Sequence, residues 1–110
     1  FYKKDISSKK FYFRNKFDLI ICHTVICYLN NKEFLRFLEQ IKKVKFNEII
    51  ICDYFCDNYD FYDNNRQIFC HNIKKIKSLF RYNFIIKIVS ERSVNRGNKL
   101  VKIKIKKRKI

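Results

Sequence analysis

Two short apolar runs, separated by a segment with helical periodicity, constrain the fold of this chain more than any other feature. The runs are residues 19–22 (LIIC) and residues 48–52 (EIIIC). Continuous apolar runs bounded by polar positions are typical of strands that are buried on both faces, as in parallel α/β sheets. A strand, a helix and a second strand in this order predict a right-handed β–α–β crossover.

The segment between the two runs predicts a helix over about residues 32–44. Its apolar side chains recur at helical spacing. They are Phe34, Leu38 and Ile41, with Leu35 and Val44 as further candidates. Asn30 or Asn31 can cap this helix, and Glu33 stands three residues after Asn30, as in a capping box.

The second half of the chain predicts a loop, another helix and a β-hairpin. Residues 53–65 are polar and aromatic without a clean period, and residues 66–81 carry an apolar stripe that predicts a helix. Residues 84–89 read as a strand, and residues 100–106 alternate apolar side chains with lysines, which is typical of a strand with one wet face. The turn between them, residues 94–98, contains the only glycine. We therefore predict an α/β fold: parallel strands with helices, ending in an antiparallel hairpin.

Composition and charge limit the classes of partner. The formal net charge is +16, and lysines and arginines concentrate in residues 102–109. Such a charge attracts polyanions, which include RNA and phosphorylated substrates. Five cysteines without a signal peptide suit a reducing cytoplasm, and no apolar run approaches the length of a membrane span. The chain begins at Phe1 and contains no Met, so we expect a piece of a longer protein whose start is missing.

The order of elements and several local motifs resemble the class I S-adenosylmethionine-dependent methyltransferases. KFDLIICHTVICYLNNKEFLRFLEQI is similar to the family's fourth strand and following helix: Phe-Asp, apolar residues, a short polar step, two apolar residues, an aromatic residue and Leu. EIIICDYF resembles the fifth strand, and Asp5-Ile6 resembles the acidic–apolar step after the third. The resemblance implies that residues 1–110 are the C-terminal half of a Rossmann-like methyltransferase sheet, from the end of strand three to strand seven.

The resemblance also implies roles for residues that would border the cofactor S-adenosylmethionine. The carboxylate of Asp5 would accept a hydrogen bond from the adenine amino group, and the backbone amide of Ile6 would meet a ring nitrogen. Cys22 and His23 would lie at the carboxyl edge of the sheet, beside the methionine part of the cofactor. His23 is also a candidate general base, because an imidazole can accept a proton near neutral pH.

Three further residues would line the acceptor pocket. The resemblance places Asp53 and Tyr54 after the fifth strand, and Asp53 could orient an acceptor hydroxyl or amine. Tyr28 is a candidate substrate contact, with a position in the core as the alternative. The sequence lacks the Asn-Pro-Pro-Tyr-like step of amino methyltransferases that act on bases, which favours a small-molecule or sugar hydroxyl as the acceptor.

One departure from the family pattern bears on activity. The Gly-rich loop that cradles the methionine part, and the acidic residue that holds the ribose, are both missing, and Gly97 is the only glycine. We therefore expect this chain alone to be inactive and a longer parent to carry the complete cofactor site.

Alternatives from other classes stay open on the sequence. A basic RNA- or nucleic-acid-binding module would combine the charge with the aromatic content, although no RNP, KH or zinc-finger pattern is present. A non-catalytic remnant would keep the half-sheet without chemistry. The cysteine and histidine spacings do not match usual zinc modules. Asp53 alone matches the ligand set by which some family members hold a divalent cation, so we predict no metal site.

Overall fold

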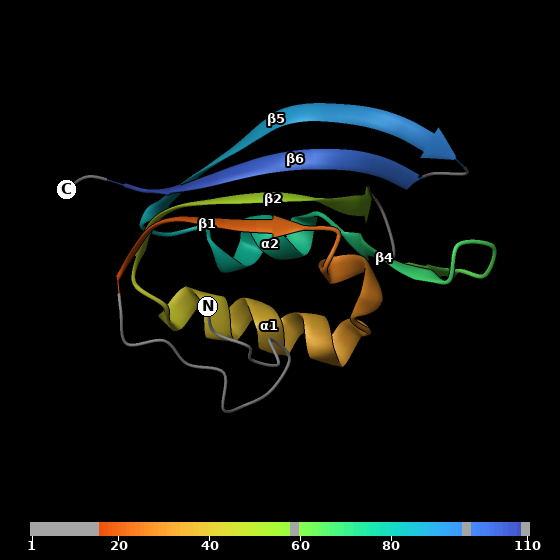
Figure 1. Cartoon of the computed structure of the whole chain (residues 1–110), viewed down its shortest axis with the longest axis horizontal. Helices are drawn as coiled ribbons and strands as arrows, with labels where there is room; N and C mark the ends of the chain where they lie inside the picture. Colours follow the sequence, from red (N-terminus) through yellow and green to blue (C-terminus); the bar gives the residue numbers. More distant parts are fainter. Residues whose placement is uncertain (1–15, 58–59, 96–97, 109–110) are drawn as a thin grey trace.

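The chain forms a mixed α/β fold built on a six-stranded sheet, and the computed structural model describes residues 16–57, 60–95 and 98–108. In chain order the elements are β1 (Phe17–His23), the 3-10 turn η1 (Ile26–Tyr28), α1 (Asn31–Lys43), β2 (Phe46–Cys56), β3 (Phe61–Asp63), β4 (Ile68–Asn72), α2 (Lys74–Leu79), β5 (Phe84–Asn95) and β6 (Asn98–Lys107). Figure 1 shows the long strands side by side, with α1 on one side of them.

Strand β2 is the centre of the sheet. β1 pairs with it in parallel on one edge, as the β–α–β order predicts, and β6 pairs with it antiparallel on the other edge. β5 lies outside β6 and completes the long antiparallel hairpin that the lysine alternation predicts. Beyond the end of β1, the short strand β4 pairs with Phe55 and Cys56 in parallel and carries β3 on its outer edge.

Both α-helices cover the same face of this sheet. The inward side chains of β2 and β6 alternate along each strand and are almost fully buried against the apolar stripes of α1 and α2. The sheet contributes Ile49, Ile51, Phe55, Val101, Ile103 and Ile105, and the helices contribute Phe34, Phe37, Leu38, Ile41, Ile76 and Phe80. One contiguous core therefore fills the space between the sheet and the helices.

The opposite face of the sheet carries no helix among the described residues. We call it the open face. On β1, Leu19 is 47% exposed and Ile21 is 66% exposed, whereas Cys22, which points to the helices, is buried. The expectation that residues 19–22 form a strand buried on both faces is therefore wrong for the described part of the chain. The apolar run arises because β1 has a covered side and an uncovered side that are both apolar.

The capping box expected at the start of α1 is confirmed. The Asn30 side chain accepts a hydrogen bond from the Glu33 amide at 2.9 Å, and the Glu33 carboxylate accepts one from the Asn30 amide at 3.0 Å. The helix then runs to Lys43, one residue short of the predicted end. Its last turn carries Lys42 and Lys43, which suit the negative end of the helix dipole.

The helix predicted over residues 66–81 is wrong in its first half. Residues 68–72 are strand β4, and only Lys74–Leu79 are helical. Ile68 and Cys70 are buried on one side of β4, and Phe69 packs edge-on against Tyr62 of β3 on the other. Pairing with β3 and with the end of β2 therefore overrides the local helical periodicity. The predicted loop over residues 53–65 likewise contains the end of β2 and all of β3.

No helix in the described ranges is both long enough and apolar enough to cross a membrane.

The two faces of the sheet should respond differently to the loss of one methyl group. Ile51 is 1% exposed on the covered face, and Ile21 is 66% exposed on the open face. We expect Ile51→Val to lower the free energy of unfolding by about 1 kcal/mol, and Ile21→Val to change it by less than about 0.5 kcal/mol. Urea denaturation followed by circular dichroism measures both values. Equal losses would show that the open face is covered in solution.

Candidate functional site

The carboxyl ends of β1 and β2 meet at one edge of the sheet. His23, the last residue of β1, lies opposite Cys52 of β2. The Thr24 amide donates a hydrogen bond to the Cys52 carbonyl at 2.9 Å, so the chain leaves β1 while still attached to β2. Open α/β sheets bind ligands outside the carboxyl ends of their parallel strands. This edge, which we call the strand-end edge, is therefore the candidate site.

The residues predicted to act here divide between the two faces of the sheet. Side chains alternate along a strand, so His23 and Tyr54 belong to the open face, and Cys22 and Asp53 belong to the covered face. His23 is exposed and Tyr54 is half-buried, while Cys22 and Asp53 are buried. A ligand that approaches from the open side would meet His23 and Tyr54 before the other two.

Asp53 is an anchor for the connection between β1 and α1. Its carboxylate is fully buried and accepts hydrogen bonds from the Ile26 amide at 2.7 Å and from the Tyr54 amide at 2.9 Å. The Ile26 amide belongs to the first turn of η1, so Asp53 caps that turn from the neighbouring strand. Burial raises the pKa of Asp53 above its ordinary value, and the backbone hydrogen bonds offset this only in part.

The cysteines around Asp53 are structural thiols. Burial, followed by the nearby Asp53 charge, raises the pKa of Cys22 to about 11 and the pKa of Cys27 to about 12. A thiol with a raised pKa is a poor nucleophile at neutral pH. None of the five cysteines forms a disulfide, and no group of three or more His, Cys, Asp or Glu side chains in the described ranges could hold a metal ion.

Thr24 is the strained position of the strand-end edge. It has a φ of 49°, in the left-handed region, where a β-branched residue is uncommon. Its hydroxyl lies 3.2 Å from the Nδ1 atom of His23 and so restricts the orientation of that imidazole. Backbone strain of this kind costs about 1–3 kcal/mol and is concentrated at ligand-binding and catalytic sites. The strain at Thr24 had no signal in the sequence.

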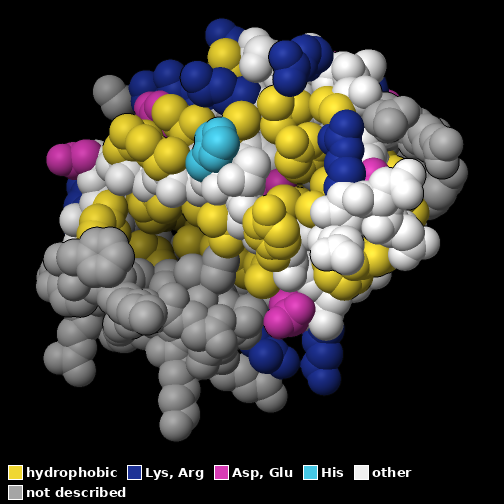
Figure 2. All heavy atoms as spheres, turned by 45° about the vertical axis from the view of Figure 1, so that its right-hand side comes forward, with side chains coloured by type: hydrophobic (Ala, Val, Ile, Leu, Met, Phe, Trp, Pro, Cys, Tyr) yellow, Lys and Arg dark blue, Asp and Glu magenta, His cyan; other side chains and the backbone are white. Residues whose placement is uncertain are grey.

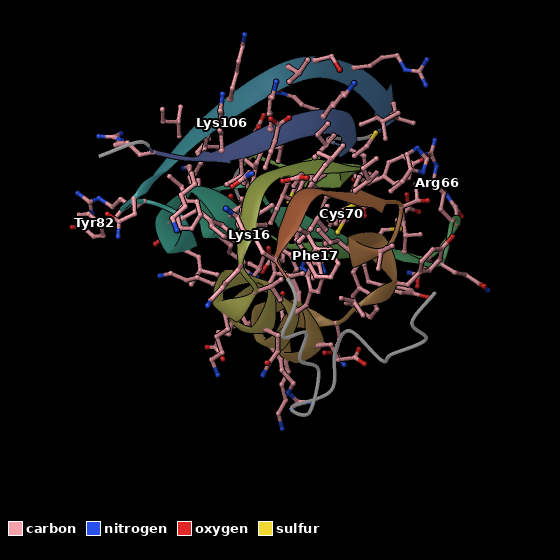
Figure 3. The ribbon with its side chains drawn as sticks, turned by 60° about the vertical axis from the view of Figure 1, so that its left-hand side comes forward. Lys16, Phe17, Arg66, Cys70, Tyr82 and Lys106 are labelled. Carbon is pink, nitrogen blue, oxygen red and sulfur yellow. The ribbon has the colours of Figure 1, made fainter. Side chains whose placement is uncertain are left out.

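Tyr54 has a cationic neighbour that the sequence reasoning missed. The Arg66 guanidinium lies 5.7 Å from the centroid of the Tyr54 ring. Figure 3 shows Arg66 at the far end of the molecule, beyond the ends of β1 and β2. Arg66 was assigned to a helix, so its approach to the strand-end edge was not predicted. Tyr28, the remaining predicted acceptor contact, is 66% exposed on η1 rather than part of the core.

Asp5 and Ile6, the predicted adenine contacts, lie outside the described residues, so the structure neither brings them to the strand-end edge nor separates them from it.

A cavity of about 420 Å³ lies between the start of α1 and strands β3 and β4. Its lining residues are Asn30, Asn31, Lys32, Asp60, Phe61, Tyr62, Phe69, Cys70 and His71. His71 is buried, stacks on Phe34 with ring centroids 4.1 Å apart, and donates a hydrogen bond from Nε2 to the Leu29 carbonyl at 2.7 Å. Burial lowers the pKa of His71, which favours the neutral ring. Through its hydrogen bond to Leu29, the ring of His71 therefore connects β4 to the end of η1.

The fold is similar to part of a solved O-methyltransferase structure. No protein-family model and no curated protein matches this sequence. Among solved structures, an O-methyltransferase from the trans-AT PKS multienzyme of Brevibacillus brevis, in complex with S-adenosyl-L-homocysteine, is similar to this chain with a TM-score of 0.70. Sequence identity is 14%, and the match covers 96% of this chain and 48% of the neighbour. The chain therefore spans about half the length of its structural neighbour.

The buried carboxylate of Asp53 gives the first prediction from this site. Asp53→Asn should lower the free energy of unfolding by about 1–3 kcal/mol, because the two backbone amides bind different oxygens of Asp53 and a carboxamide offers only one oxygen as an acceptor. Because the folded-state pKa of Asp53 is raised above its ordinary value, the contribution of Asp53 to stability is fully present below that ordinary value. It is lost as the pH rises through the folded pKa.

The stability gap between wild type and Asp53→Asn should therefore narrow from acidic to neutral pH in denaturant titrations. Asp18→Asn, at an exposed position on β1, is the control and should cost less than about 0.5 kcal/mol at every pH. A gap that widens with rising pH would contradict the raised pKa.

The strain at Thr24 gives the second prediction. Thr24→Gly should leave the free energy of unfolding unchanged or raise it by up to about 1 kcal/mol, because glycine adopts positive φ without a steric penalty. Val25→Gly, at a φ of −105°, should lower it by about 1 kcal/mol or more. Thermal unfolding of both variants measures the difference. A clear loss of stability in Thr24→Gly would show that the backbone there is not strained.

Proposed function

We propose that this chain supplies one half of a class I S-adenosylmethionine-dependent methyltransferase domain that transfers a methyl group to a small-molecule or sugar hydroxyl. The observation that carries the proposal is the match of 96% of the chain to a methyltransferase fold. The motif Phe17-Asp18 to Leu29 independently supports it, because its polar step falls at the end of β1. In this proposal the chain is the C-terminal half of the methyltransferase sheet, the half that ends in the antiparallel hairpin.

The described residues suit part of a cofactor site. The strand-end edge offers an exposed imidazole at His23, a strained turn at Thr24 and a half-buried ring at Tyr54. In this proposal Asp5 and Ile6 hold the adenine, and Cys22 and His23 border the methionine part. The described residues contain no glycine, so a Gly-rich cradle would have to come from elsewhere. We propose that this chain alone does not bind the cofactor.

The chemistry assigned to this chain is mostly positioning. S-adenosylmethionine supplies an electrophilic methyl group on a sulfonium. Tyr28 and Tyr54 contact the acceptor, and Arg66 restricts the Tyr54 ring. His23 accepts the proton that an acceptor hydroxyl must lose, and its contact with Thr24 fixes the ring. Asp53 acts through the backbone, because its carboxylate holds η1 and the Tyr54 amide in place.

Calorimetric titration of S-adenosyl-L-homocysteine tests the proposal. The protein titrated should be the whole natural polypeptide that contains this chain, because the chain spans about half of the structural neighbour. We expect micromolar binding, and a loss of about 10-fold or more in Asp5→Ala, since hydrogen bonds to a charged group contribute about 1.5–3 kcal/mol.

Asp18→Ala is the matched control, because it also removes a carboxylate, but at the start of β1, away from the strand-end edge. It should leave the affinity within about twofold. His23→Ala should reduce methyl transfer more than it reduces cofactor affinity, if the imidazole accepts a proton from the acceptor. The absence of binding to a folded polypeptide would refute the proposal.

A further inference from the structure

Four strands of the sheet meet side by side at the edge opposite the strand-end edge. β1 begins at Phe17, which lies opposite Phe46 at the start of β2, and the antiparallel strand β6 ends beside that start. The Arg108 amide donates a hydrogen bond to the Asn83 carbonyl at 2.8 Å, which joins the end of β6 to the turn before β5. Figure 1 shows β1 and β2 beginning, and β6 ending, on the side of the C-terminus. We call this the strand-start edge; it is about 14 Å wide, because neighbouring strands lie about 4.8 Å apart.

The strand-start edge carries five exposed cations, which we call the edge cations. Lys16 precedes β1, Lys45 precedes β2, Arg81 precedes β5, and Lys107 and Arg108 lie at the end of β6. In the described ranges none of the five forms an ion pair. The register of the sheet therefore brings together charges that are far apart in the sequence.

The carboxylates near this edge do not neutralise the edge cations. Glu48 is paired with Lys104 at 3.4 Å, and Asp18 accepts a hydrogen bond from the Asn47 amide group at 3.2 Å. Among the described residues, Asp18 is thus the carboxylate left to balance the five cations beside it. A concentration of positive charge of this kind attracts polyanions.

Tyr82 adds an aromatic ring to the strand-start edge. The side chain is 71% exposed, and the Arg81 guanidinium lies 5.4 Å from the centroid of its ring. Asn83, with a φ of 68° in the left-handed region that asparagine tolerates, turns the chain into β5 directly after it. Figure 3, which turns this side of the molecule forward, shows Tyr82 at its margin. Exposed aromatic rings and arginines are the side chains on which the bases of single strands stack.

We propose that the strand-start edge binds single-stranded nucleic acid, with phosphates along the edge cations and a base stacked on Tyr82. The charges supply most of the affinity, and stacking on the ring selects a chain whose bases are unpaired. The surface lies at the opposite end of β1 and β2 from His23 and Tyr54. The inference therefore does not rest on the proposed methyl transfer.

An anionic membrane suits this edge less well than nucleic acid does. Segments that bind a bilayer surface place an apolar face among the headgroups, beside their cations. The exposed large apolar side chains next to the edge cations are Tyr82 and Ile85, in the described ranges. Phe46 and Phe84 stack on each other with ring centroids 5.6 Å apart, and Phe46 is buried. The edge thus offers charge and one exposed ring rather than an apolar face.

The open face is the rival surface for nucleic acid on this chain. Lys102 and Lys104 lie on it along β6, and it carries the rings of His23 and Tyr54 at the strand-end edge. Figure 2, which turns the strand-end side forward, shows mostly hydrophobic side chains there, with Lys and Arg mainly around the margin. Tyr54 is half-buried, whereas Tyr82 is 71% exposed. The strand-start edge therefore offers the more accessible ring beside unpaired cations, and the experiment compares the two surfaces directly.

Removal of charge from each surface is the first comparison. Fluorescence anisotropy measures binding of a uridine oligonucleotide of about 12 nucleotides to the whole natural polypeptide that contains this chain. Lys45→Ala with Arg108→Ala should weaken binding at least about 10-fold. It should also reduce the slope of log affinity against log salt by about 1.4, since each phosphate contact on a single strand contributes about 0.7. Lys87→Ala with Lys102→Ala, on the open face, removes the same charge and should change the affinity by less than about threefold.

Removal of the ring is the second comparison. Tyr82→Leu should weaken the oligonucleotide at least about fivefold without changing the salt slope, and Tyr82→Phe should bind as wild type does. Tyr28→Leu, at a tyrosine that is 66% exposed at the other end of the sheet, is the matched control and should have no effect. A glutamate peptide of the same charge, which has no bases, should bind more weakly and should not respond to Tyr82→Leu. Circular dichroism verifies that each variant is folded.

Four results would overturn the proposal. Loss of oligonucleotide binding in the Lys87 and Lys102 variant, with binding retained in the Lys45 and Arg108 variant, would assign nucleic acid to the open face. Wild-type affinity in Tyr82→Leu would exclude stacking on that ring. Binding of phosphatidylserine vesicles without binding of the oligonucleotide would assign the edge cations to a membrane surface. Absence of oligonucleotide binding to the folded polypeptide, with no binding of vesicles either, would show that the edge does not take a polyanion.

Discussion

The buried carboxylate of Asp53 holds the strand-end edge together. It lies on the central strand β2 and accepts hydrogen bonds from the first turn of η1 and from its own neighbour Tyr54. The segment between β1 and α1 is therefore attached to β2 at two points, through the Thr24 amide and, two residues later, through the Ile26 amide. Burying a carboxylate is costly unless its oxygens are satisfied, and here backbone amides satisfy both.

Local signals predicted the parts of the fold that depend on neighbours in sequence. The helix after Asn30 was found because its cap, its acidic partner Glu33 and its apolar stripe all lie within one segment. The hairpin was found because its lysines alternate with period two along a single strand. Strand β4 was not found, because its partners are β3 and the end of β2, and a periodic stripe through Phe69 and Ile73 suggested a helix instead.

The candidate site was predictable in position but not in detail. The polar residues that follow two apolar runs indicated a common sheet edge, and Cys22, His23, Asp53 and Tyr54 do lie along it. Their division between two faces depends on the register of β1 against β2, which no single segment encodes. The role of Asp53 depends on a backbone amide 27 residues away. The approach of Arg66 to Tyr54 depends on the β3–β4 turn, which the sequence pattern did not reveal.

The lysines of the open face also matter for the chain on its own. A sheet with an unpaired edge and an exposed apolar surface tends to associate with other copies through that edge. Charged side chains on the same surface oppose such association, and a high net charge keeps copies apart. Lys104 of β6 lies directly opposite Ile50 of β2, whereas Ile21 lies one strand further away on β1, so positive charge borders the exposed apolar side chains on one flank.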